Sequence, residues 1–137
     1  MPVIFDTGAL FALADRADPA HERTRAALAA ERSPIVVPEP VLTETCILMG
    51  RRRGGRDERA LLESFVRTGW ALEPLERVDL ARVPELMDQY ADADLGFVDA
   101  SITAIAERLR VSRIYTLDRR DFVLVRPRHV PAFEILP

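Results

Sequence analysis

The stretch Val3-Ile4-Phe5-Asp6-Thr7-Gly8 is the first of several strand-like runs in this sequence. Three consecutive apolar residues followed by an acid, a threonine and a glycine are typical of a buried strand that ends in a turn or at a helix start. Short apolar runs of the same kind predict four more strands, at residues 35–37, 70–72, 114–117 and 133–136. Such strands, alternating with helices, indicate an α/β fold with a parallel sheet that is covered on both faces.

Helical sequence separates these runs. Asp18-Pro19 is typical of a helix start, because Asp caps the helix and Pro suits the first helical position. The last helix is the most regular, with an apolar stripe from Val98 to Leu109. Pro84 is expected to break or offset the helix that contains it. The expected helices cover residues 9–14, 18–31, 38–49, 57–66, 75–90 and 98–109, and residues 92–96 are expected to form a loop.

Length and composition indicate a single domain that covers residues 1–137. Hydrophobic residues make up 48% and charged residues 30% of the chain, which is the balance of a globular protein. No apolar run approaches the roughly 20 residues that span a bilayer, and the first residues lack the basic start of a signal peptide. The single cysteine, Cys46, excludes an internal disulfide and a cysteine-based metal site. The expected location is therefore a reducing cytoplasm, with no membrane partner.

All 19 basic residues are arginines, and the chain has no lysine. This excludes a P-loop nucleotide site, which needs a lysine after its second glycine, and it excludes lysine Schiff-base chemistry. The formal net charge of −3 argues against nucleic-acid binding over the whole surface. A local basic groove is still compatible with this charge, because arginines can cluster.

Two acids directly follow predicted strands, Asp6 after the first and Asp118 after the fourth. In open parallel sheets, ligands bind beyond the C-terminal ends of the strands, at the point where the winding reverses. If these two strands are neighbours, their carboxylates meet there. Each acid taken alone can equally be a turn residue or a helix cap.

Two further acids lie within predicted helices. Glu44 shares an apolar stripe, so its carboxylate points toward the core, where an unpaired charge is costly. A glutamate that snorkels to solvent is the alternative interpretation. Asp99 lies in the first turn of its helix, where an acid commonly complements the helix dipole. Asp92 lies upstream of it, and Asp94 and Asp121 are interpreted as solvated loop acids.

Asp6, Glu44, Asp99 and Asp118 form an acidic set without a histidine or cysteine partner. Ligands that are all oxygen atoms favour Mg²⁺ or Mn²⁺ over Zn²⁺. Carboxylates around such cations occur in nucleases, where the metal binds the scissile phosphate and activates water. Without a cation, the four carboxylates would repel one another and any phosphate substrate. The signatures Gly-x-Ser-x-Gly and Gly-x-Gly-x-x-Gly, which mark other catalytic or nucleotide sites, are absent.

Four motifs resemble those of the PIN-domain family, and most closely those of its bacterial VapC-type toxins. They are Phe5-Asp6-Thr7-Gly8-Ala9-Leu10, the mid-helix Glu44, Leu95-Gly96-Phe97-Val98-Asp99-Ala100-Ser101 and Thr116-Leu117-Asp118-Arg119-Arg120-Asp121-Phe122. Each motif is weak alone, but together they occur in order at the expected ends of strands and helices. The resemblance implies a three-layer α/β/α sandwich with a short, mostly parallel central sheet. It also implies a Mg²⁺- or Mn²⁺-dependent endoribonuclease, the toxin of a toxin–antitoxin pair, whose site a cognate VapB-type antitoxin covers.

The resemblance further assigns roles to individual side chains. Asp94 stands where the family often has an uncharged residue, so it is left out of the expected site. Homodimers are common in this family, and a homodimer is compatible with the sequence. The expected site residues are the catalytic acids Asp6, Glu44, Asp99 and Asp118, of which Asp6 and Asp99 match the usual metal ligands, and the supporting residues Thr7, Asp92 and Thr116.

Arginines near these acids are expected to hold the RNA backbone, through phosphate contacts that give affinity without sequence information. The candidates are Arg51, Arg52, Arg53 and Arg119. The alternatives are a solvated helix end for the first three and, for Arg119 or Arg120, a structural ion pair with Asp121. Two other functions stay open. One is a PIN-type nuclease that acts on another structured nucleic acid outside a toxin pair, and the other is a PIN-like domain that binds partners without catalysis.

Overall fold

The computed structural model describes residues 1–137, which form helices around a central five-stranded sheet. The strand order is β3-β2-β1-β4-β5, and every neighbouring pair is parallel. The predicted parallel sheet is therefore confirmed, and no antiparallel strand accompanies it. The strands are β1 (Val3–Phe5), β2 (Ile35–Pro38), β3 (Ala71–Glu73), β4 (Arg113–Tyr115) and β5 (Glu134–Leu136).

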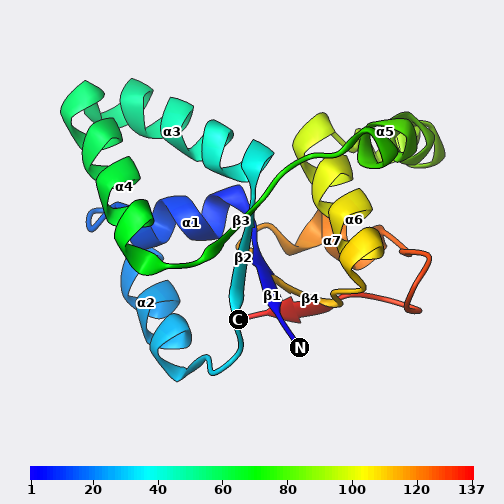
Figure 1. Cartoon of the computed structure of the whole chain (residues 1–137), viewed down its shortest axis with the longest axis horizontal. Coiled ribbons are helices and arrows are strands. Elements are labelled where there is room, and N and C mark those ends of the chain that lie inside the picture. Colours follow the sequence, from blue (N-terminus) through cyan, green and yellow to red (C-terminus); the bar gives the residue numbers. More distant parts are fainter.

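The helices form one layer on each side of this sheet, which Figure 1 shows nearly edge-on. Helices α1 to α4 lie on one side and α5 to α7 on the other, which confirms the three-layer α/β/α arrangement. No helix is long and apolar enough to cross a membrane. The helices are α1 (Thr7–Ala14), α2 (His21–Ala30), α3 (Glu39–Arg53), α4 (Gly55–Thr68), α5 (Arg77–Gln89), α6 (Phe97–Leu109) and α7 (Arg119–Leu124), with a short 3-10 helix at Ala91–Ala93.

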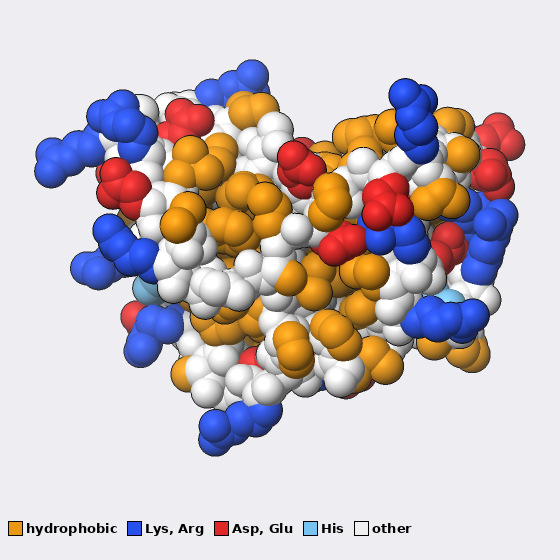
Figure 2. Space-filling model, in the orientation of Figure 1, with side chains coloured by type: hydrophobic (Ala, Val, Ile, Leu, Met, Phe, Trp, Pro, Cys, Tyr) orange, Lys and Arg blue, Asp and Glu red, His pale blue; other side chains and the backbone are white.

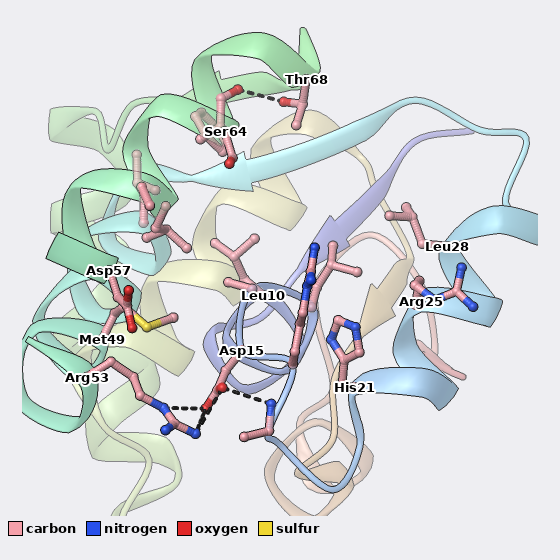
Figure 3. A pocket seen from close by; sticks show the side chains of 18 of the residues that line it. Leu10, Asp15, His21, Arg25, Leu28, Met49, Arg53, Asp57, Ser64 and Thr68 are labelled. Atoms are coloured by element: carbon pink, nitrogen blue, oxygen red, sulfur yellow. Dashed lines mark hydrogen bonds and ion pairs between the residues drawn. The ribbon is translucent and has the colours of Figure 1, made fainter.

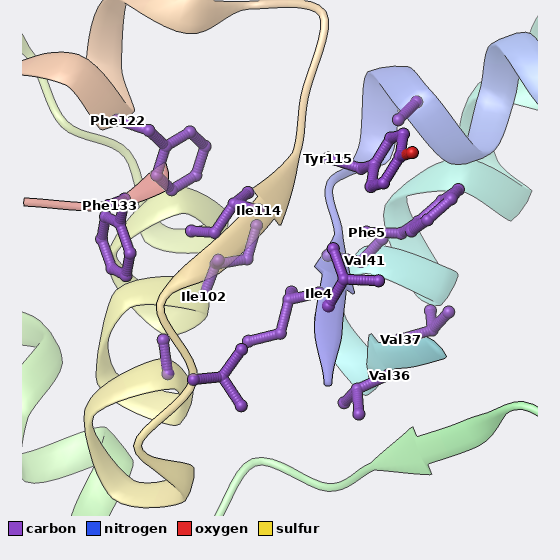
Figure 4. Packing of buried hydrophobic residues seen from close by; sticks show 14 of the residues in the cluster. Ile4, Phe5, Val36, Val37, Val41, Ile102, Ile114, Tyr115, Phe122 and Phe133 are labelled. Atoms are coloured by element: carbon purple, nitrogen blue, oxygen red, sulfur yellow. The ribbon is translucent and has the colours of Figure 1, made fainter. Parts of the chain in front are cut away.

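The core lies on both faces of β1 and β4, because alternate side chains of a strand point to opposite faces. Ile114 lies with Ile102 on the α6 side of the sheet, close to Phe122 and Phe133 (Figure 4). On the α1 side, Phe5 and Tyr115 stack with their ring centroids 4.8 Å apart. All three residues of β1 are fully buried. The apolar run that opens the sequence is thus the centre of the sheet, with helices on both of its faces.

Several sequence-based boundaries need correction. Strand β4 ends at Tyr115, two residues earlier than predicted, and the chain then forms α7, a helix that the apolar pattern did not indicate. Pro84 does not break α5, which runs from Arg77 to Gln89. Pro84 cannot donate to the carbonyl four residues earlier, but that residue, Leu80, is exposed, so water can satisfy the freed carbonyl. Helices α3 and α4 each extend beyond their predicted ends.

The winding of the sheet reverses between β1 and β4. Strand β1 is followed by β2 on one side of it, whereas β4 pairs with its other side, in register from Val3–Arg113 to Phe5–Tyr115. This is the position at which open parallel sheets bind ligands, beyond the C-terminal ends of the two strands. The residues that follow β1 and β4 therefore form the first place to look for a site.

Candidate active site

Asp6 forms the buried floor of the site. It follows β1 directly, caps α1, and is only 7% exposed. Its backbone N–H donates to the Tyr115 carbonyl at 2.9 Å, and its carboxylate accepts hydrogen bonds from the Thr7 backbone N–H and from the Thr116 hydroxyl, the latter at 2.5 Å. Burial raises the pKa of Asp6, and the charges of Glu44 and Asp118 raise it further, against the effect of these hydrogen bonds. The carboxylate is therefore held rigidly in a place that disfavours its charge.

Thr116 and Asp118 form the neighbouring wall, beyond β4. The Thr116 hydroxyl accepts from the Asp118 backbone N–H at 3.1 Å while it donates to Asp6. Asp118 caps α7 and accepts from the Arg120 backbone N–H at 3.3 Å. Both strand-end acids thus cap helices, as the alternative interpretation held, and both also face a shared site. Asp118 is exposed, in contrast to the buried Asp6.

Glu44 and Asp99 approach the same point from α3 and from the first turn of α6. Burial raises the pKa of Asp99 to about 8, and the charges of Asp6, Asp121 and Glu44 add to this shift. The apolar stripe of Glu44 predicted a side chain that points into the core, but Glu44 is half-buried in the structure. The structure therefore brings the predicted acids together from four separate elements, and mutual repulsion makes the metal-free site unfavourable for full ionisation.

Asp121 belongs to this group, and its interpretation as a solvated loop acid is wrong. It is half-buried and lies in the first turn of α7. It forms a hydrogen bond with Asp99, and this bond and its charge raise the pKa of Asp99. Its spacing from Asp118 could have indicated this position, because residues three apart lie on one side of a helix. That signal went unused because α7 was not expected. Asp92 and Asp94 behave differently, since both are exposed near the 3-10 helix and neither contributes to the pKa of Asp6 or Asp99.

The predicted RNA-binding arginines separate into different environments. Arg53 donates to both carboxylate oxygens of Asp15, at 3.1 and 3.2 Å. Arg52 lies over the ring of Phe11, 5.0 Å from its centroid. Arg51 makes neither kind of contact and lines a groove together with Glu44. Arg119 donates to the Pro137 backbone oxygen at 3.0 Å, and the expected alternative of an ion pair with Asp121 is not formed.

A cavity of about 760 Å³ lies apart from the acidic site. It lies between α1 and α2 on one side and α3 and α4 on the other (Figure 3). Leu10, Leu28 and Met49 give it apolar walls, and the Arg53–Asp15 ion pair lies at its edge. Figure 2 shows acidic side chains near the middle of this face, between the α3–α4 side and the α5–α6 side. The chain thus has an apolar groove and an acidic site as two separate features.

The donor set of the acidic site fits a hard divalent cation. No three carboxylates are close enough to form a ready three-ligand set, but Mg²⁺ is commonly held by one or two carboxylates together with water molecules. Asp6 and Asp99 supply two, and the charge of Asp6 raises the pKa of Asp99, an effect that a bound cation would offset. The buried Thr7 hydroxyl lacks a hydrogen-bond partner and adds an unused oxygen beside Asp6. The residues therefore fit Mg²⁺ or Mn²⁺ better than Zn²⁺.

The fold is a parallel sheet with helices on both faces, and carboxylates lie at its switch point. These features define an α/β protein with an acidic site suited to phosphodiester chemistry. The PIN domain profile matches residues 3–126, and the chain belongs to the PIN domain family. The match includes all the acids described above.

Individual relatives agree with this assignment. Ribonuclease VapC26 of Mycobacterium tuberculosis is 30% identical over 135 residues, which make up 98% of this chain and 100% of that relative. The structure of VapC20 from Mycobacterium tuberculosis, a toxin that cleaves the sarcin–ricin loop, has a TM-score of 0.80 at 24% identity, covering 91% of this chain and 99% of that chain. VapBC2 from Rickettsia felis, bound to a DNA fragment from their promoter, has a TM-score of 0.73 at 14% identity with full coverage of both chains.

Proposed function

We propose that this protein is the toxin ribonuclease of a toxin–antitoxin pair and hydrolyses RNA phosphodiester bonds with the help of Mg²⁺ or Mn²⁺. The observation that carries this proposal is the convergence of Asp6, Glu44, Asp99 and Asp118 at the switch point of the sheet. The nearly full-length similarity to ribonuclease VapC26 supports RNA as the substrate.

In this proposal, Asp6 and Asp99 hold the cation, which when bound supplies charge for the scissile phosphate and lowers the pKa of water. Thr116 fixes the orientation of the Asp6 carboxylate through its 2.5 Å hydrogen bond. Glu44 and Asp118 face the same space and are placed to orient a water molecule and accept its proton. Asp121 keeps Asp99 in position by sharing a hydrogen bond with it.

Cleavage is expected to need added Mg²⁺ or Mn²⁺ and to stop in a chelator, because the acidic set offers only oxygen ligands. Zn²⁺ is expected to be a poor substitute. The measurement is cleavage of total cellular RNA by the purified protein, stripped of metal and then resupplied with each ion. Asp6→Asn serves as the inactive control. Full activity in chelator, with metal content verified as negligible, would rule this mechanism out, and specific RNA binding without any cleavage would favour a non-catalytic domain.

The proposed antitoxin has two places to bind. An acidic site attracts a cationic side chain, so a segment that folds on binding can place an arginine or lysine near Asp6 and Asp99. The apolar groove between α1–α2 and α3–α4 offers a separate surface for the apolar side of the same segment. The structural similarity to VapBC2 is consistent with such a complex.

Replacing the site acids is expected to weaken antitoxin binding. Asp6→Asn and Asp99→Asn each remove a charge that would face the basic residue, so affinity falls and its dependence on salt decreases. The measurement is a titration with the protein encoded by a neighbouring small reading frame, at two salt concentrations. Asp92→Asn is the matched control, because Asp92 is an exposed acid outside the site. Unchanged affinity and salt dependence in both site variants would contradict this mode of inhibition.

A further inference from the structure

A second groove, of about 500 Å³, runs from the acidic site along α3 and is separate from the large cavity of Figure 3. Helix α3 forms one wall, and the segment before α5 together with the first turn of α6 forms the other. The residues that matter here are Glu44, Ile47, Leu48, Arg51, Leu75 and Val98. Glu44 belongs to both the groove and the acidic site, so the two adjoin at this residue.

The α3 wall presents an ordered series of chemistries. Glu44, Ile47, Leu48 and Arg51 are spaced by three and four residues, so they occupy one side of the helix. From Glu44 to Arg51 the helix rises by about 10 Å, at 1.5 Å per residue. An acid thus lies at one end, apolar side chains lie in the middle, and a guanidinium lies at the other end. Ile47 is 46% exposed, which is unusual for isoleucine and leaves its side chain open to a ligand.

Arg51 differs from the two arginines that follow it. Arg53 is held by Asp15 and Arg52 by the ring of Phe11, both away from this groove. Arg51 is exposed and lines the groove without an ion pair or aromatic contact of its own. Its guanidinium is therefore available to an external anion. Glu39 also lines the groove but lies beyond Glu44, so negative charge gathers at the end opposite Arg51.

We propose that this groove binds the nucleotide next to the scissile phosphate, with its base against Ile47, Leu48 and Val98 and its outer phosphate on Arg51. The inference rests on the proposed ribonuclease function and adds a position for the substrate to it. An RNA strand presents the matching order of chemistry, because a base with apolar faces lies between two phosphates. The inner phosphate is then at the acidic site, and the long side chain of Arg51, which starts two turns of α3 further on, reaches back toward the outer phosphate.

The test uses steady-state cleavage of a short RNA that contains a site cleaved by the wild-type protein. Arg51→Ala is expected to raise KM about ten-fold with kcat unchanged, and to reduce the salt slope of binding by about one. Arg67→Ala is the matched control and is expected to leave KM within about two-fold of wild type, because Arg67 is an exposed arginine on α4 outside this groove.

The base contact is tested with a second pair of variants and a modified substrate. Ile47→Ala is expected to raise KM several-fold on the intact RNA, and to have no effect when the nucleotide flanking the cleaved bond is abasic. Val66→Ala on α4, at an 82% exposed residue, is the control for an apolar truncation elsewhere. Arg51→Ala is expected to keep its effect on the abasic substrate, because the phosphate is still present.

Several outcomes would overturn the groove assignment while leaving the ribonuclease intact. These are an Arg51→Ala variant that behaves like Arg67→Ala, or an Ile47→Ala penalty that is the same on intact and abasic RNA. A changed sedimentation coefficient in both groove variants, with unaltered KM, would assign the groove to a second copy of the chain and overturn the proposal. A wild-type protein that cleaves no RNA at all would instead contradict the proposed function, and the groove assignment would fall with it.

Discussion

The Asp99→Asn variant is expected to lose at least about a hundred-fold in RNA cleavage, since even residues that only support a metal ligand cost 10- to 100-fold. Asn keeps the size of the side chain and one oxygen, but it lacks the charge that holds a cation. Asp99 lies in the first turn of α6, facing Asp6, Asp121 and Glu44. The same substitution removes a charge from a crowded site, so it is expected to affect stability in the opposite direction.

The sign of the stability effect follows from the pKa of Asp99. Burial and neighbouring acids raise this pKa to about 8 in the folded chain, from 3.8 as the ordinary value. The folded state therefore binds more protons than the unfolded state between these two values, so stability falls as the pH rises from about 4 to about 8 and levels off above that. The metal-free wild type is expected to melt at a lower temperature at pH 9 than at pH 6. Asp99→Asn carries no such titration and is expected to lose less, and to be at least as stable as wild type at pH 9.

Thermal melts of both proteins in chelator and in Mn²⁺ make this measurable. Mn²⁺ is expected to stabilise the wild type by mass action, by about 2.7 kcal/mol at a hundred-fold excess over its dissociation constant. That gain is expected to shrink sharply in Asp99→Asn and to persist in Asp92→Asn, the exposed control. If Asp99 were only a partner of the helix dipole, the variant would instead be less stable in chelator by roughly 0.3–1 kcal/mol. A variant that is less stable in chelator and gains as much from Mn²⁺ as wild type would make Asp99 structural.

The strands and the acids that follow them were predictable because their signals are local. A buried parallel strand needs a continuous apolar run, and Val3 to Phe5 supplies one at the centre of the sheet. Asp6 directly follows this strand, so it must lie at the C-terminal edge of the sheet. Glu44 and Asp99 were joined to this site by the family resemblance, and in the structure Glu44 approaches Asp6 from within α3 and Asp99 approaches it from the first turn of α6.

The features that sequence reasoning missed depend on how a helix is rotated about its axis. Arg51, Arg52 and Arg53 are consecutive, but successive residues of a helix point about 100° apart. Arg51 therefore lines the groove of Glu44, whereas Arg52 covers Phe11 and Arg53 pairs with Asp15. Such a division depends on the packing of α3 against α1, which no local pattern reports. The role of Asp121 was missed for a related reason, since α7 is too short to produce an apolar period.

The opposite end of α6 carries a buried ion pair. Breaking this pair is expected to cost much stability without changing catalysis. Arg108 donates to Asp79 at 3.0 Å and to Glu73 at 2.8 Å, and so joins α6 to the start of α5 and the end of β3. Asp79 is 2% exposed and also accepts the Glu76 backbone N–H at 2.9 Å in a capping box. Removal of the guanidinium would leave this buried carboxylate without its cation.

Arg108→Ala is therefore expected to lower the free energy of unfolding by about 3 kcal/mol, near the lower end of the range for broken buried pairs, because Arg108 itself is partly exposed. The exposed pair Arg25–Glu22 supplies the control, and Arg25→Ala is expected to cost at most about 0.5 kcal/mol. The double variant Arg108→Met/Asp79→Asn keeps the cap without the charge and is expected to recover much of the loss. Urea unfolding measures all three, and a cost for Arg108→Ala no larger than that for Arg25→Ala would refute the argument. Well below its melting temperature, Arg108→Ala is expected to retain kcat, so that the two ends of one helix separate stability from catalysis.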